Sequence, residues 1–229
     1  MKNRLLYRFI VVVFIILSAD SLLADIPKTL EIAFKNMEAD TIFSYAFYKR
    51  TVQEDKTILE SYDPSLPKGK RWKLISVKGK EFNREKIEEQ LDKKNEVEKS
   101  NENTEGTQIS MEDMKNFKLI NESNGVLTYS FKLNSEQNDK MAKFVDGEIL
   151  VEKNQNRIKE IKMYNQSPFS PALSVKIDTF NVDMKFEEIH DTGTNKIKSV
   201  NTKVKGKALI FKNIDQEVKE EYFNYNLVE

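Results

Sequence analysis

His190 and Asp191 are the adjacent side chains of this sequence whose types most readily do chemistry. An imidazole beside a carboxylate can share a metal ion or act as an oriented base, but both arrangements need further ligands or a nucleophile. His190 is the sole histidine, and the chain has no cysteine. The pair follows a predicted strand and precedes Thr192-Gly193, so we expect His190 to lie in an exposed turn.

Adjacent carboxylates are the second group with catalytic potential. Glu88-Glu89 and Glu187-Glu188 could divide the acid and base roles of glycoside hydrolysis. With 37 acidic residues in the chain, however, such pairs arise by chance and usually occupy solvated faces. The seven glycines lie at least ten residues apart, which excludes G-x-G-x-x-G and Walker-type phosphate loops. The sequence therefore predicts a protein that is not an enzyme and that uses no cofactor or metal ion.

Aromatic residues remain, with 14 phenylalanines, 8 tyrosines and one tryptophan. Side chains two apart on a strand share a face, so aromatic rings at alternate positions gather on one side of a sheet. Such rings can line an apolar ligand cavity, or they can form ordinary packed core. The residues expected to line a cavity, if one is open, are Phe43, Tyr45, Phe47, Trp72 and Phe131.

Most of the chain beyond residue 40 has the two-residue apolar period of β-strands, interrupted by turn-forming residues. The predicted strands cover 40–53, 57–62, 71–77, 127–133, 145–151, 157–164, 173–188, 196–211 and 218–227. Asn213-Ile214-Asp215 is predicted to be the turn before the last strand. In segment 173–188 the apolar residues change from odd to even positions, which predicts a β-bulge near Asp178-Thr179. Long, bent strands of this kind favour a curved sheet.

Residues 84–99 differ from the rest because charged side chains dominate and only Ile87, Leu91 and Val97 are apolar. With Asn83 as a possible N-cap, this pattern predicts an exposed helix. The polar stretch that follows has too little apolar surface to order itself. We therefore expect a charged helix and a flexible loop at about 83–110, with residues 93–108 as the flexible part.

Residues 1–24 have the pattern that the secretion machinery recognises. Three basic residues precede the apolar run 9–17, which is shorter than the roughly 20 residues of a membrane span, and Ala24 ends the segment. We expect cleavage after Ala24 and a periplasmic location, with an uncleaved anchor as the alternative. The mature chain, 25–229, is then a single β-rich domain with no transmembrane segment.

The charge and cysteine content of the mature chain restrict its partners and its covalent cross-links. It keeps 34 basic and 36 acidic residues, a net charge of −2, so no overall positive charge favours nucleic acid as a partner. Without cysteine it has neither disulfides nor a lipid attached to an N-terminal cysteine. A chain of this length can fold on core packing alone.

The block 63–80, D-P-S-L-P-K-G-K-R-W-K-L-I-S-V-K-G-K, resembles a signature of uncharacterised exported proteins of Gram-negative bacteria. In that family a D-P-S-x-P-x-G-x-R-W-x-L-x-x-V-x-G run precedes a charged helix, as it does here. Later segments with similar spacing are 144–147, 167–169 and 204–208. The resemblance covers most of residues 40–225 and implies no assigned activity.

The expected fold class is α+β and β-dominated: a strongly curved antiparallel sheet, or half-open β-barrel, with one or two helices. This shape is similar to that of the Lol-type lipoprotein carriers, which hold acyl chains in an apolar cavity closed by helices. Because fold does not fix function, no carrier residue is transferred. The expected function is binding or carrying a lipid or other apolar ligand, with a lipid, acyl chain or lipoprotein as partner. The alternative is a structural or interaction module of the cell envelope with a filled core.

Overall fold

The computed structural model describes residues 26–39, 45–79, 84–100, 110–134, 142–189, 193–209 and 212–228. The predicted signal segment 1–24, Phe43, and the pair His190 and Asp191 lie outside these ranges. The helices are α2 (Lys28–Ala39), α3 (Arg84–Ser100) and the short 3-10 helices η2 (Met111–Asp113) and η3 (Ala142–Phe144). The strands are β1 (Tyr45–Gln53), β2 (Lys56–Tyr62), β3 (Trp72–Lys78), β4 (Met114–Ser123), β5 (Val126–Leu133), β6 (Val145–Glu152), β7 (Arg157–Asn165), β8 (Phe169–Ala172), β9 (Val175–Ile189), β10 (Thr194–Ala208) and β11 (Lys212–Leu227).

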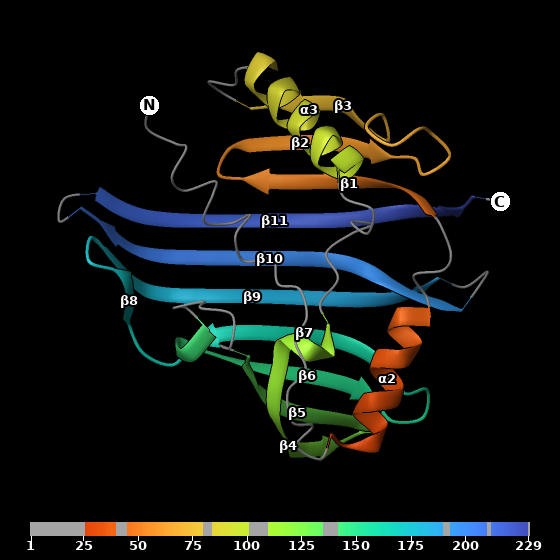
Figure 1. The fold of residues 1–229 in the computed structure, drawn as a ribbon, viewed down its shortest axis with the longest axis vertical. Coiled ribbons are helices and arrows are strands. Elements are labelled where there is room, and N and C mark those ends of the chain that lie inside the picture. Colours follow the sequence, from red (N-terminus) through yellow and green to blue (C-terminus); the bar gives the residue numbers. More distant parts are fainter. Residues whose placement is uncertain are drawn as a thin grey trace.

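All of these strands join one open antiparallel sheet in the order β3-β2-β1-β11-β10-β9-β7-β6-β5-β4, with β8 paired to β9 (Figure 1). Most neighbours in the sheet are also neighbours in sequence. The exceptions are two pairs: β1 pairs with β11, and β7 pairs with β9. The edges of this path are β3 and β4. The predicted fold class, a β-dominated α+β protein built on one large antiparallel sheet, is confirmed.

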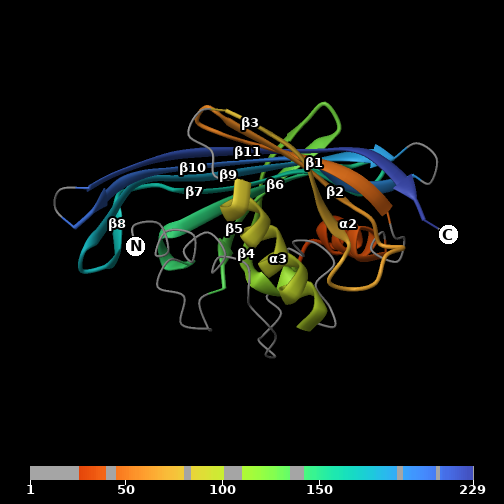
Figure 2. The same cartoon turned by 90° about the horizontal axis from the view of Figure 1, so that it is seen from above.

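The sheet arches, and helices α2 and α3 lie on its concave side (Figure 2). The predicted bulge is part of this curvature. Along the β9–β10 ladder Lys205 faces Thr179, but Gly206 faces Ile177, so Asp178 is the extra residue. A β-carbon at Gly206 would lie 2.1 Å from the main-chain oxygen of Lys176, which is why glycine is needed where the strands approach here. The prediction of a bulge near Asp178-Thr179 is confirmed.

Helix α2 covers the main core at the β5–β9 end of the concave face. Its buried residues Leu30, Ala33 and Phe34 fall at i, i+3 and i+4, so they form one stripe that faces the sheet. The strand residues buried with them are Met114, Leu127, Tyr129, Phe131, Val145, Ile149, Val151, Ile158, Ile161, Met163, Phe169, Ile177, Phe180, Val182, Met184 and Ile214. None of the described helices is long and apolar enough to cross a bilayer.

The structure corrects the predicted turn at 213–215 and the predicted flexible stretch 93–108. The prediction of a turn at Asn213-Ile214-Asp215 is wrong, because this segment lies inside β11. There Ile214 is buried in the core and Asp215 forms an ion pair with Lys205 on β10. The strand reverses earlier, between Ala208 and Lys212. The charged helix is confirmed over Arg84–Ser100, so residues 93–100 of the predicted flexible stretch are helical.

Candidate functional site

An aromatic cluster lies on the concave face at the β1–β3 end of the sheet. Cross-strand pairing places Phe47 opposite Tyr62, and Tyr62 opposite Trp72. The ring centroids of Phe47 and Tyr62 are 5.1 Å apart, and those of Tyr62 and Trp72 are 4.9 Å apart. From β11, Tyr222 and Tyr225 bring their rings within 5.8 and 5.4 Å of Phe47. These separations are those of aromatic pairs that stabilise each other beyond simple burial.

The residues predicted to line a cavity divide between two places. Tyr45, Phe47 and Trp72 belong to the aromatic cluster, in which the Tyr45 ring lies 6.1 Å from that of Tyr225. Phe131 instead lies in the core under α2 and is 2% exposed. It sits directly opposite Gly147, and a β-carbon there would come within 2.0 Å of its ring. Phe131 is therefore tightly packed against the neighbouring strand.

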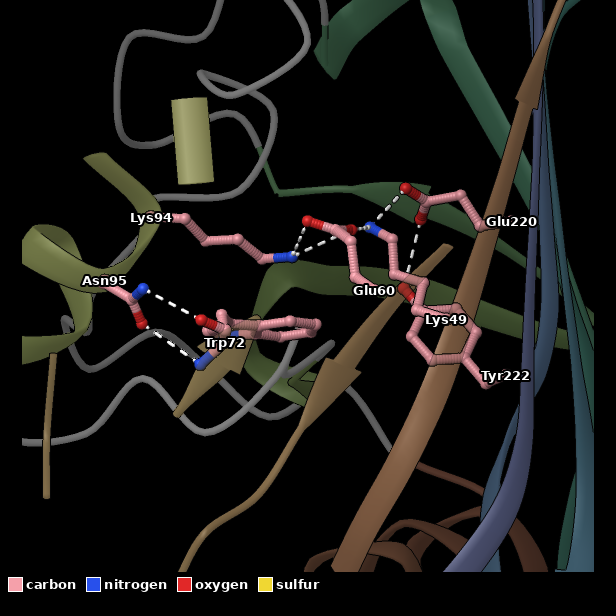
Figure 3. A network of polar contacts seen from close by, with 7 residues as sticks. All are labelled: Lys49, Glu60, Trp72, Lys94, Asn95, Glu220 and Tyr222. Atoms are coloured by element: carbon pink, nitrogen blue, oxygen red, sulfur yellow. Dashed lines mark hydrogen bonds and ion pairs between the residues drawn. The ribbon is translucent and has the colours of Figure 1, made fainter. Parts of the chain in front are cut away.

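Four charged side chains lie beside the aromatic cluster and form a charge cluster of zero net charge (Figure 3). The ammonium nitrogen of Lys49 lies 2.6 Å from Glu220 and 4.0 Å from Glu60. The ammonium nitrogen of Lys94, on α3, lies 3.3 Å from both carboxylate oxygens of Glu60. The side chains of Lys49 and Glu60 are each only 13% exposed, so these charges lose much of their hydration. Removing one member of a buried ion pair destabilises a protein, because the other charge is left desolvated and without its partner.

Burial changes the proton affinities of this cluster. It lowers the pKa of Lys94 to about 8, and the positive charge of Lys49 acts in the same direction, while Glu60 opposes the shift. For Glu220, burial alone would raise the pKa, but Lys49, the hydrogen bond from Tyr222 and the charge of Lys94 together outweigh burial and hold the pKa below its usual value. Burial, and then the charge of Glu220, raise the pKa of Tyr222, whose hydroxyl donates to that carboxylate at 3.1 Å. Lys94 thus titrates close to neutral pH.

Helix α3 is attached to the sheet largely through polar contacts. Asn95 accepts a hydrogen bond from the main-chain N–H of Trp72 and donates one to its C=O, both at 3.1 Å. The ammonium nitrogen of Lys94 lies 3.1 Å from the centroid of the Trp72 ring, a cation–π contact. Leu91 and Ile87, about one and two turns earlier on this helix face, are only half-buried. Helix α3, which lies over the aromatic cluster, therefore buries little apolar surface against the sheet.

Between the two helix-covered regions, β9, β10 and β11 carry half-buried apolar side chains, here called the concave strip: Phe186, Val200, Val204 and Val218. Cross-strand pairing shows that these side chains lie on the concave face. Val204 lies opposite Phe180, and Val200 lies opposite Met184, both of them buried in the core under α2. Val200 also lies opposite Glu220, so the same face continues into the charge cluster. Neither helix covers the middle of β10 and β11 (Figure 1).

A second concavity, an open hollow of about 290 Å³, lies on the other face of the sheet. It is lined by Lys162, Tyr164, Asn181, Asp183, Asn201 and Lys203, among others. Burial and a hydrogen bond with Glu160 raise the pKa of Asp183. Burial alone would raise the pKa of Glu160 too, but the Lys162 ammonium, 3.0 Å away, helps to hold it below its usual value. Lys162 and Lys185 lie 3.0 and 3.8 Å from Glu160 and offset part of the negative charge of this carboxyl pair.

Sequence reasoning missed the charge cluster, although it left a signal. Lys49 and Glu60 occupy the same strand parity as Phe47 and Tyr62, so charged residues stand where an apolar face is expected. Their partners Lys94 and Glu220 are too far away in sequence to be assigned without the fold. Among the described residues, no three histidine, aspartate or glutamate side chains are arranged to hold a metal ion. Comparison of the chain with protein-family models, curated proteins and solved structures finds no match.

Proposed function

We propose that this chain is an exported, periplasmic, non-enzymatic protein that binds an apolar chain, such as the acyl chain of a lipid, on the concave face of its sheet. The observation that carries the proposal is the continuity of that face. The concave strip leads from the core under α2 to the aromatic cluster under α3, and its valines are only half-buried. An apolar chain lying along this strip would remove apolar surface from water.

In this proposal α3 is a movable cover. Its contact with the sheet depends on Asn95, on Lys94, and on two half-buried apolar residues. Keeping Lys94 charged in this position has an energetic cost, which its lowered pKa reflects. An element with few buried apolar contacts belongs to the low-stability part of a fold and opens more readily than the core. The physical properties of α3 are therefore those expected of a cover.

The chemistry of the site favours the chain of the ligand over its head group. Each methylene removed from water contributes about 0.8 kcal/mol. The charge cluster pairs two lysines with two glutamates, so it offers no net charge to a charged head group. The ligand class that we propose is therefore a long-chain amphipathic lipid, or a lipoprotein bound through its acyl chains.

The alternative function, an interaction module of the cell envelope with a filled core, is favoured by one observation. Phe131, one of the residues expected to line a cavity, is packed against Gly147. Under this alternative the α2 end of the concave face is ordinary core, and the sheet serves as a scaffold for partners bound elsewhere.

A fluorescent polyene fatty acid separates the two functions. Titration of the wild type is expected to show saturable binding with an increase in probe fluorescence. Val218→Asp, which places a carboxylate on the concave strip, should weaken binding at least about tenfold because a charge is costly to desolvate. Leu119→Asp on edge strand β4, where the side chain is 52% exposed, is the matched control and should bind like the wild type. Absence of probe binding to a folded wild type would support the interaction module.

A further inference from the structure

Two exposed leucines lie side by side at one end of the long strands. Leu173, in the turn between β8 and β9, is fully exposed, and Leu209, just after β10, is 67% exposed. The main-chain N–H of Leu209 donates to the carbonyl of Ser174 at 2.7 Å, which joins the two segments. This tip projects at the left of Figure 1, and β8 bends toward the side of the sheet that carries the helices (Figure 2). Scattered exposed leucines are ordinary, but two that adjoin at a projecting end form a patch.

Lysines flank these leucines and exceed the local acids. Lys176 lies directly opposite Lys207 on the β9–β10 ladder, although like charges in that position repel. Lys212, the first residue of β11, is exposed as well. The nearby acids are already used: Asp178 lies 3.2 Å from Lys176, and Asp215 lies 3.1 Å from Lys205. The tip is therefore locally basic in a chain whose overall charge is close to zero.

We propose that this tip docks on an anionic lipid bilayer. The leucine side chains would enter the interfacial region of the bilayer while Lys176, Lys207 and Lys212 remain at the level of the anionic head groups. Apolar contact and electrostatic attraction to anionic lipid each give weak binding, and their combination gives specific docking. This proposal does not rest on the ligand-binding function, because the tip and the concave strip consist of different residues.

The test is co-sedimentation of the full mature chain with vesicles of phosphatidylcholine alone or mixed with phosphatidylglycerol. We expect binding to the anionic vesicles that declines as salt is raised through the physiological range, and little binding to the neutral ones. Leu173→Ser combined with Leu209→Asn should lower the partition coefficient at least about tenfold. Asparagine suits position 209 because Leu209 has a φ of 48°, a left-handed conformation that asparagine tolerates. Lys207→Glu with Lys212→Glu should also abolish the preference for anionic vesicles.

Matched controls locate the contact. Leu119→Ser with Ile120→Ser changes two aliphatic residues of β4 that are 52% and 54% exposed, and it should bind vesicles like the wild type. Lys70→Glu with Lys118→Glu makes the same charge change at exposed sites elsewhere. Failure of the wild type to bind anionic vesicles, or tip variants that bind them as tightly as the wild type, would overturn the proposal. Because fatty-acid titration of the tip variants should match the wild type, a failure of docking is distinguishable from a failure of ligand binding.

Discussion

The side-chain amide of Asn95 forms hydrogen bonds with both main-chain groups of Trp72, as a neighbouring strand would. Trp72 begins β3, one of the two edge strands of the sheet path, so its outward N–H and C=O have no strand partner. Exposed sheet edges invite pairing with other chains, and proteins protect them in various ways. Here the side-chain amide of Asn95 pairs with the two main-chain groups of Trp72 at the sheet edge, and it also holds α3 over the aromatic cluster (Figure 3).

Asn95→Ala should loosen α3 without unfolding the sheet. The substitution removes two hydrogen bonds at a site that is 8% exposed, with an expected cost of about 1–3 kcal/mol to the docking of the helix. Hydrogen exchange should then quicken across α3 while the strands of the main core keep their protection. Glu96→Ala, on the exposed side of the same helix, is the control and should leave exchange unchanged. Equal protection of α3 in the Asn95 variant and the wild type would show that this contact does not hold the helix.

The docking of α3 should strengthen as the pH rises from 8 to 10. The pKa of Lys94 is about 8 in the folded chain, below the value of roughly 10.4 for an unfolded lysine. Between those two values the folded chain binds fewer protons than the unfolded chain, so stability rises with pH. Below about pH 8 the charged ammonium must be held partly desolvated. We expect the emission of Trp72, the sole tryptophan, to follow this transition because Lys94 lies on its ring.

Lys94→Met tests the origin of that pH dependence. Methionine keeps an apolar side chain of similar length and removes the titrating ammonium group, so the pH dependence of α3 docking between pH 8 and 10 should be lost. Lys93→Met, whose side chain points to solvent beside Glu89, should retain it. A Lys94→Met protein that shows the same transition as the wild type would assign the titration to another group.

Phe131 and Gly147 should behave as a packed pair. Gly147→Ala places a methyl group 2.0 Å from an atom of the Phe131 ring, so the ring must move, at a cost of about 1–3 kcal/mol in the free energy of unfolding. Phe131→Ala alone should cost about 3–5 kcal/mol. Denaturant midpoints of Gly147→Ala, of Phe131→Leu and of the variant that combines these two substitutions measure the coupling. Recovery of part of the loss in the double variant is expected, whereas additive losses would mean that the two positions do not contact.

The sequence was sufficient to predict the sheet and helix α3, but not helix α2 or the charge cluster. Two-residue periodicity located most strands, and a change of parity located the bulge at Asp178. Helix α2 was missed although Leu30, Phe34 and Met37 follow a helical spacing, because the segment adjoins the predicted signal region. The charge cluster could not be predicted since Lys49 and Glu220 meet only when β11 inserts beside β1. Long-range strand order depends on the whole packing of the sheet, which local patterns do not contain.

Export predicts a defined N-terminus. If the secretion machinery removes residues 1–24, protein isolated from the cell envelope should begin at Asp25. N-terminal sequencing or peptide mapping of that fraction checks this. Recovery of peptides that contain Arg4 would instead identify an uncleaved membrane anchor.

Native mass spectrometry of the protein purified from the envelope of its own host tests lipid binding most directly. The account predicts a population whose mass exceeds that of the polypeptide by one lipid, which is released on collisional activation. Val218→Asp should reduce this population, and Leu119→Asp should not. A polypeptide mass without bound lipid in the wild type, together with no uptake of the fatty-acid probe, would contradict lipid binding on the concave face.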